Sequence, residues 1–118
     1  MLQLTVEDKF AAAHQLYNYD GPCENMHGHT WKMAITVEGT KLDPSGILVD
    51  FKILKGLLHE VFLMFDHKVI NDIIPFSPTS ENLAKFIYDH VKNKLPKGVS
   101  VAKTVVWESD TAYATYFE

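Results

Sequence analysis

The chain has 118 residues, 47% of them hydrophobic and 22% charged, which is the composition of one globular domain covering residues 1–118. Its 15 acidic and 11 basic residues give a formal net charge of −4, and every basic residue is a lysine, which argues against nucleic-acid binding because that function usually needs an arginine-rich basic patch. No apolar run reaches the roughly 18 residues that a membrane-spanning helix needs, and the lone cysteine, Cys23, cannot form an internal disulfide, so we expect a cytoplasmic protein without a membrane partner.

The first third of the chain predicts two strands. Residues 2–14 begin with alternating apolar and polar side chains, which predicts a strand with a β-bulge near Asp8. Residues 15–26 are rich in turn formers and predict a connection. Residues 30–38 predict a second strand that ends at Gly39. The apolar side chains of one parity in this strand are Trp31, Met33, Ile35 and Val37.

Two amphipathic helices follow these strands. Asp50 is a suitable N-cap for a helix over residues 51–64, in which apolar side chains recur every three or four positions. Thr79 or Ser80 can cap the second helix. A proline and a glycine in residues 96–98 are expected to end it.

The chain closes with two more predicted strands, residues 100–108 and 112–117, joined by a turn at residues 109–111. The order strand, strand, helix, helix, strand, strand indicates an α+β fold, in which an antiparallel four-stranded sheet carries both helices on one face. The other face of the sheet also holds apolar residues that need a cover. Another subunit can supply that cover, so we expect a homo-oligomer.

Three histidines are spaced as metal ligands. His27 and His29 flank Gly28, and residues two apart in an extended chain point to the same side, so both rings can reach one point. Gly28 would allow a close approach of another backbone or of a ligand. If the first two strands pair as a hairpin, His14 lies beside the other two. Three imidazoles with no fourth protein ligand are typical of catalytic zinc; copper or nickel would also suit them, and loop histidines without a metal are the alternative.

Three further groups have a chemical interpretation beside an ordinary one. Cys23 precedes His27 by four residues, and a nearby cation would favour its thiolate as a base or nucleophile; a lone cysteine is otherwise a small apolar residue. Asp66 can orient the neighbouring His67 for proton transfer, or it can simply cap a helix beside a surface histidine. Glu108 either faces solvent or accepts two N–H groups from a heterocycle.

Several segments together resemble the 6-pyruvoyl-tetrahydropterin synthase family. Residues 23–29 read Cys-Glu-Asn-Met-His-Gly-His, which is similar to the Cys-x-x-x-His-Gly-His signature of the family's 6-carboxytetrahydropterin synthase branch. Four more segments resemble family motifs in the same order along nearly the whole chain. They are residues 10–14, 43–51, 65–67 and 78–84.

The resemblance implies a tunnelling fold, in which subunits join their sheets into an oligomeric barrel, usually a hexamer made of two trimers with active sites between subunits. The implied zinc ligands are His14, His27 and His29. The implied catalytic residues are Cys23 as general base and Asp66 with His67 as a proton relay. The implied pterin-binding residues are Glu108 as the anchor of the ring and Thr79, Ser80 and Glu81 along its pocket.

The implied reaction converts 7,8-dihydroneopterin triphosphate to 6-carboxytetrahydropterin, with release of acetaldehyde and triphosphate, on the route to queuosine. Glu24 leaves a folate-branch alternative open, because a relative uses a glutamate near this position to form a 6-hydroxymethyl pterin. A 6-pyruvoyl-tetrahydropterin synthase-like activity and a non-catalytic zinc- or pterin-binding module are further alternatives. Lysines alone would have to meet the triphosphate, without the bidentate fork of arginine.

Overall fold

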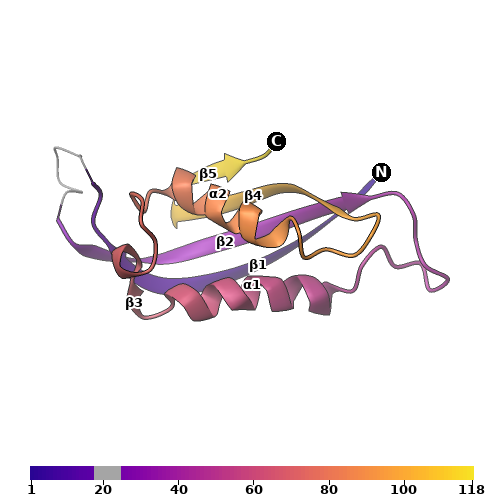
Figure 1. The fold of residues 1–118 in the computed structure, drawn as a ribbon, viewed down its shortest axis with the longest axis horizontal. Coiled ribbons are helices and arrows are strands. Elements are labelled where there is room, and N and C mark those ends of the chain that lie inside the picture. The colour runs from indigo at the N-terminus through magenta and orange to yellow at the C-terminus, as the bar shows by residue number, and fades with distance from the viewer. Residues whose placement is uncertain (18–24) are drawn as a thin grey trace.

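The computed structural model describes residues 1–17 and 25–118 and contains the predicted helices and long strands (Figure 1). Along the chain, the elements are β1 (Leu2–His14), β2 (His27–Gly39), α1 (Phe51–Phe65), β3 (Lys68–Val69), the 3-10 helix η2 (Ile70–Asp72), α2 (Ser80–Val91), β4 (Ser100–Ser109) and β5 (Ala112–Tyr116). None of the helices in the described ranges is long and apolar enough to cross a membrane.

The sheet has five strands in the order β3-β1-β2-β4-β5, so the predicted four-stranded antiparallel sheet is wrong in two respects. β3 adds a fifth strand, and it runs parallel to β1. This strand is only two residues long, and a pair of residues carries no alternation that a sequence pattern could reveal.

The β1–β2 hairpin keeps one register from Leu2 opposite Gly39 to His14 opposite His27, so the predicted bulge near Asp8 is wrong. The register shift in this part of the sheet lies between β2 and β4, at Thr36 and Val37. An uninterrupted register keeps every second side chain of β1 on one face over its whole length. That continuity brings the ends of β1 and β2 together at the edge of the helical layer.

Both helices cover one face of the sheet, as predicted. Figure 1 shows α1 running along β1, and α2 lying against β4 and β5. The even residues of β1 and the odd residues of β2 point into this layer. The largest buried side chains of the layer include Trp31, Met33, Ile35, Leu54, Leu58, Phe65, Leu83 and Ile87. We call this side of the sheet the helix-covered face and the other side the open face.

The helix ends follow ordinary capping chemistry. Asp50 Oδ1 accepts a hydrogen bond from the backbone N–H of Lys52 at 2.8 Å, as predicted. Thr79, rather than Ser80, is the N-cap of α2, and its Oγ1 accepts from the backbone N–H of Asn82 at 3.1 Å. α2 ends at Val91, before the predicted terminator at 96–98. Ser80 is therefore the first helical residue, and its side chain is free to contact another group.

The open face is mostly polar. Thr5 and Thr36 hydroxyls lie 2.7 Å apart, and Lys32 Nζ lies 3.3 Å from Glu7 Oε1 and 4.5 Å from the centre of the Trp107 ring. Trp107 of β4 is the register partner of Lys32 and lies on this face. A second subunit placed here would meet hydrogen-bonding groups as well as aromatic surface.

Candidate functional site

His14, His27 and His29 converge at the end of the β1–β2 hairpin, and we call them the histidine cluster. His14 is the register partner of His27, and His29 faces Ala12. The three rings meet edge-on, with centroid separations of 4.5, 4.6 and 5.1 Å. Glu108 of β4 reaches the same place, and one potential ligand atom from each of the four side chains lies within 4.8 Å of all the others. The predicted meeting of the three histidines is confirmed.

Backbone carbonyls fix the protonation of two rings in the histidine cluster. His14 Nδ1 lies 2.7 Å from the carbonyl oxygen of Pro78, and His27 Nδ1 lies 2.7 Å from that of Asn25. A carbonyl oxygen can only accept, so each Nδ1 carries the proton and each Nε2 of the neutral ring keeps its lone pair. The two Nε2 atoms lie 3.0 Å apart. Two lone pairs at this distance repel each other unless a cation lies between them.

His29 adds a third nitrogen to this point. Among the described residues, its Nε2 is the one buried side-chain N or O atom without a hydrogen-bond partner. Such atoms are rare in folded proteins and often mark a bound ion or a catalytic role. The Oε1 atom of Glu108 lies 3.3 Å away, close enough for an ion pair but without forming a hydrogen bond.

The environment of His14 and His29 favours the neutral imidazole. Burial is the main cause that lowers the pKa of His14, and it outweighs the hydrogen bond to Pro78, which raises that pKa; the neighbouring rings of the cluster lower it further. Burial also lowers the pKa of His29 against the opposing attraction of Glu108. A neutral ring is the form that can donate a lone pair to a metal.

The donor set fits zinc. Zinc binds imidazole nitrogen at about 2.0–2.1 Å in a tetrahedral arrangement, which separates two ligand nitrogens by roughly 3.3–3.4 Å. The Nε2–Nε2 distance of 3.0 Å between His14 and His27 is near that value. Three nitrogens with one carboxylate nearby can hold a divalent cation, although the donor types alone also suit other transition metals.

Gly28 is not needed for a close contact inside the chain, since a Cβ there would lie 3.8 Å from the carbonyl oxygen of Ala12.

Trp31 packs against two rings of the histidine cluster, and none of the sequence motifs includes it. Its side chain is fully buried, and its ring lies edge-on to His14 at 4.8 Å and to His29 at 5.3 Å. Its Nε1 donates to the carbonyl oxygen of Ala12 at 3.3 Å. The shared parity of positions 27, 29 and 31 was the available signal, because it places all three side chains on one face of β2. The carbonyl oxygen of Pro78 was missed as well, and no side-chain pattern could have indicated it.

The start of α2 lies beside this group. Ser80 is buried, and its Oγ donates to Glu108 Oε2 at 3.4 Å. Thr79 is occupied as the helix cap. Glu81 is exposed, and no hydrogen bond or ion pair joins it to another described side chain. Of the three predicted pocket residues, Ser80 alone contacts Glu108.

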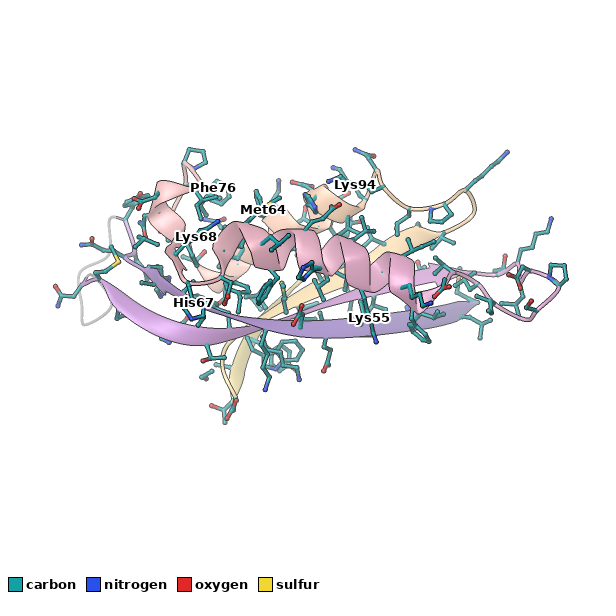
Figure 2. The ribbon with its side chains drawn as sticks, turned by 90° about the horizontal axis from the view of Figure 1, so that it is seen from below. Lys55, Met64, His67, Lys68, Phe76 and Lys94 are labelled. Atoms are coloured by element: carbon teal, nitrogen blue, oxygen red, sulfur yellow. The ribbon has the colours of Figure 1, made fainter. Side chains whose placement is uncertain are left out.

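Asp66 and His67 form a pair at the outer edge of β1. Asp66 Oδ2 lies 2.8 Å from His67 Nδ1, and its Oδ1 accepts from the backbone N–H of Ala11 at 3.0 Å. Those two hydrogen bonds lower the pKa of Asp66, with the backbone bond as the larger cause. His67 has a positive φ of 58°, and its side chain is 82% exposed beside the C-terminal end of α1 (Figure 2). In the described part of the chain, no hydrogen bond of this pair reaches the histidine cluster.

Cys23 and Glu24, the two candidate bases, lie outside the described residues. Their interpretation rests on their position in the sequence, directly before the hairpin strand that carries His27. The described chain resumes at Asn25, whose carbonyl oxygen holds His27.

The known proteins similar to this chain include several that are named tetrahydropterin synthases. The family described as 6-pyruvoyl tetrahydropterin synthase matches residues 3–118. A Bacillus subtilis protein named 6-carboxy-5,6,7,8-tetrahydropterin synthase is 40% identical over 106 residues, covering 81% of this chain and 70% of its own. A Haemophilus influenzae protein of the same name is 30% identical over 144 residues, covering both chains completely. The solved Caenorhabditis elegans 6-pyruvoyl tetrahydropterin synthase has a TM-score of 0.86 at 24% identity, covering 99% of this chain and 95% of its own.

Proposed function

This chain belongs to the 6-pyruvoyl tetrahydropterin synthase family, and we propose that it is a cytoplasmic, zinc-dependent lyase that converts 7,8-dihydroneopterin triphosphate to 6-carboxytetrahydropterin, a step toward queuosine. Two relatives that bear the 6-carboxy-5,6,7,8-tetrahydropterin synthase name support this choice within the family. The observation that carries the metal-dependent part is the meeting of three imidazole nitrogens, one of them buried without a partner at His29.

In this proposal His14, His27 and His29 hold zinc through their Nε2 atoms. The carbonyl oxygens of Pro78 and Asn25 keep two of these rings in the required tautomer, as partners of metal-bound histidines generally do. When bound, zinc would polarise hydroxyl oxygens of the substrate side chain and make a neighbouring proton more acidic. The protein groups around the ion then have to remove that proton and return another.

Cys23 is proposed as the base that removes the proton, in its thiolate form. A cation beside a thiol favours that form, and Cys23 precedes His27 by four residues. His67 is proposed to return a proton elsewhere on the substrate. Asp66 uses one oxygen to orient His67 and the other to bind the backbone of β1, so the imidazole has a fixed tautomer and an outward-facing Nε2.

The exposed edge position of His67 supports an active site completed by a second subunit. A proton donor that faces solvent and, among the described residues, has no hydrogen bond to its own histidine cluster is well placed to serve the site of a neighbouring copy. We therefore propose a homo-oligomer with active sites between subunits, a hexamer of two trimers in which the sheets join into a barrel.

Glu108 is proposed as the anchor of the pterin ring. A carboxylate can accept two parallel N–H bonds from a guanidine-like ring edge, as it does from an arginine. Ser80 holds one of its oxygens, and the buried side chains Thr104 and Val106 share its face of β4. Thr79 and Glu81 are proposed to complete the ring pocket.

A second candidate function has one relative in its favour. A Pyrococcus furiosus protein named dihydroneopterin monophosphate aldolase is 33% identical over 87 residues, covering 74% of each chain. Glu24 would take the place of Cys23 as base in that case, and the product would be a 6-hydroxymethyl pterin. A zinc- or pterin-binding module without catalysis would need neither residue.

Two single variants decide between these candidates when turnover and zinc content are measured together. Cys23→Ala is expected to lower turnover by about 10²–10⁴-fold, the usual effect of losing a general base, while the zinc content stays at the wild-type level. Glu24→Ala is the matched control from the adjacent position and should keep most of the activity. An active Cys23→Ala protein with an inactive Glu24→Ala protein would establish the aldolase-like reaction instead. Wild-type protein that binds zinc but catalyses neither reaction would support the non-catalytic binding module.

A further inference from the structure

The two carboxylate oxygens of Glu108 have different neighbours. Its Oε2 accepts a hydrogen bond from Ser80 Oγ at 3.4 Å. Its Oε1 points the other way, to the buried and unpartnered Nε2 of His29 at 3.3 Å. The ligand atoms of Glu108 and the three histidines all lie within 4.8 Å of one another. Glu108 is therefore close enough to the three histidines to bind an ion that they would hold.

We propose that Glu108 is the fourth ligand of the metal while no substrate is bound, and that binding of the pterin ring removes the Glu108 carboxylate from the metal. The inference rests on the proposed function, since it concerns the same metal and the same pterin. Zinc in proteins nearly always has four ligands, and a site with three protein ligands fills the fourth position with water or substrate. Here a carboxylate is already positioned to fill it.

Charge supports this arrangement. Three neutral imidazoles leave a divalent ion with its full double charge, and the one carboxylate in the group offsets half of it. The His29 side chain is 25% exposed and that of Glu108 is 37% exposed, so the attraction is screened less than between fully exposed groups. A carboxylate at this position should therefore tighten metal binding in the resting protein.

The two roles of Glu108 compete. To accept a pair of N–H groups from a pterin, the carboxylate has to present both oxygens in one plane to the ring edge. In the structure one oxygen faces the histidine cluster and the other is engaged by Ser80. Binding of the ring should therefore release the fourth metal position at the moment when the substrate side chain arrives. Linkage requires the converse, that bound metal weakens the binding of a pterin ring that has no side chain to offer in exchange.

Cobalt(II) is the probe for this inference, because its visible absorption changes with its ligand set. The intact protein would be titrated with Co²⁺ in the absence of any pterin, as wild type and as the Glu108→Gln variant. Glu38→Gln is the matched control, since Glu38 lies on the open face and, among the described residues, hydrogen-bonds Gln3 alone. We expect Glu108→Gln to bind Co²⁺ at least about tenfold more weakly and with a changed spectrum, and Glu38→Gln to match wild type.

A second variant separates ligation from simple charge. Glu108→Asp keeps the charge and withdraws the oxygens by one methylene, so a true ligand predicts a changed spectrum, and a mere neighbouring charge predicts the wild-type one. Unsubstituted pterin, which has the ring edge and no side chain, should then shift the wild-type spectrum and weaken Co²⁺ binding. Far-UV circular dichroism of each variant confirms that it is folded.

The outcomes are distinguishable from failure of the proposed function. Equal Co²⁺ affinity and identical spectra in wild type and folded Glu108→Gln would overturn the fourth-ligand role and leave the lyase proposal standing. Failure of the wild-type protein to bind Co²⁺ or Zn²⁺ stoichiometrically would overturn both. A wild-type spectrum in Glu108→Asp would also overturn the inference, since charge alone would then explain the effect.

Discussion

Substitution of Trp31 tests how much the buried indole beside the histidine cluster contributes to the stability of the fold. The indole is fully buried, lies edge-on to His14 and His29, and stacks on Phe10 at 6.2 Å between ring centres. Its N–H is bonded to the carbonyl oxygen of Ala12. Trp31→Phe keeps an aromatic ring at this position but removes the N–H and the second ring of the indole.

The expected cost has two parts. Loss of the hydrogen bond to a buried carbonyl is worth about 1 kcal/mol. The space left by the smaller ring adds about 1–2 kcal/mol, because a packed core collapses only in part around a void. We therefore expect the free energy of unfolding of the metal-free protein to fall by about 2–3 kcal/mol. At about 4 °C per kcal/mol for a chain of this size, the melting temperature should fall by about 8–12 °C.

Circular dichroism is the appropriate assay, because the substitution itself changes the tryptophan fluorescence. Trp107→Phe is the matched control: Trp107 is the other tryptophan on these strands, is only partly buried, and lies on the open face beside Lys32 and Tyr113. It should cost less than about 1 kcal/mol. Equal destabilisation by the two substitutions would refute the packing argument for Trp31.

Three further predictions concern stability. Burial lowers the pKa of His14 and His29 from the ordinary value of 6.5, so the unfolded chain binds more protons than the folded protein does. The melting temperature of the metal-free protein should therefore fall as the pH drops below about 6.5, and a melting temperature that does not change with pH would contradict this. Thr104→Val removes a buried hydroxyl that donates to the carbonyl oxygen of Ala84 at 2.6 Å, and should cost about 1 kcal/mol in urea unfolding without changing zinc affinity. Gly39→Ala would place a Cβ 2.8 Å from a backbone oxygen of the facing loop; we expect a loss of about 1–3 kcal/mol, and wild-type stability would show that the loop moves away freely.

The long elements were predictable because each carries its own periodic signal. The alternation in β2 fixed which side chains face the helices, and the hairpin between β1 and β2 then placed His14 opposite His27. Asp8 shows how such a signal misleads. It interrupts the apolar face of β1, which predicts a bulge, but the strand is regular there. Asp8 lies beside Lys55 and His59 at the edge of α1, where it stays in contact with water.

Contacts that depend on the pairing of strands distant in the chain could not be predicted from the sequence. Glu108 could be assigned to one face of its strand, but its approach to His29 depends on the β2–β4 register, which puts Lys32 opposite Trp107. β3 pairs with β1 through backbone contacts, next to the hydrogen bond from the His67 N–H to the carbonyl oxygen of Ala11, and such contacts leave no side-chain pattern. The resemblance of short motifs to those of the family predicted the roles of the site residues, whereas the distances between their side chains came from the fold.

The identity of the product shows which reaction this chain catalyses. Zinc-loaded protein would be incubated with 7,8-dihydroneopterin triphosphate, and the products would be identified by mass. We expect 6-carboxytetrahydropterin together with acetaldehyde and triphosphate. A 6-hydroxymethyl pterin as the product would contradict the proposed function and assign the chain to the aldolase-like reaction.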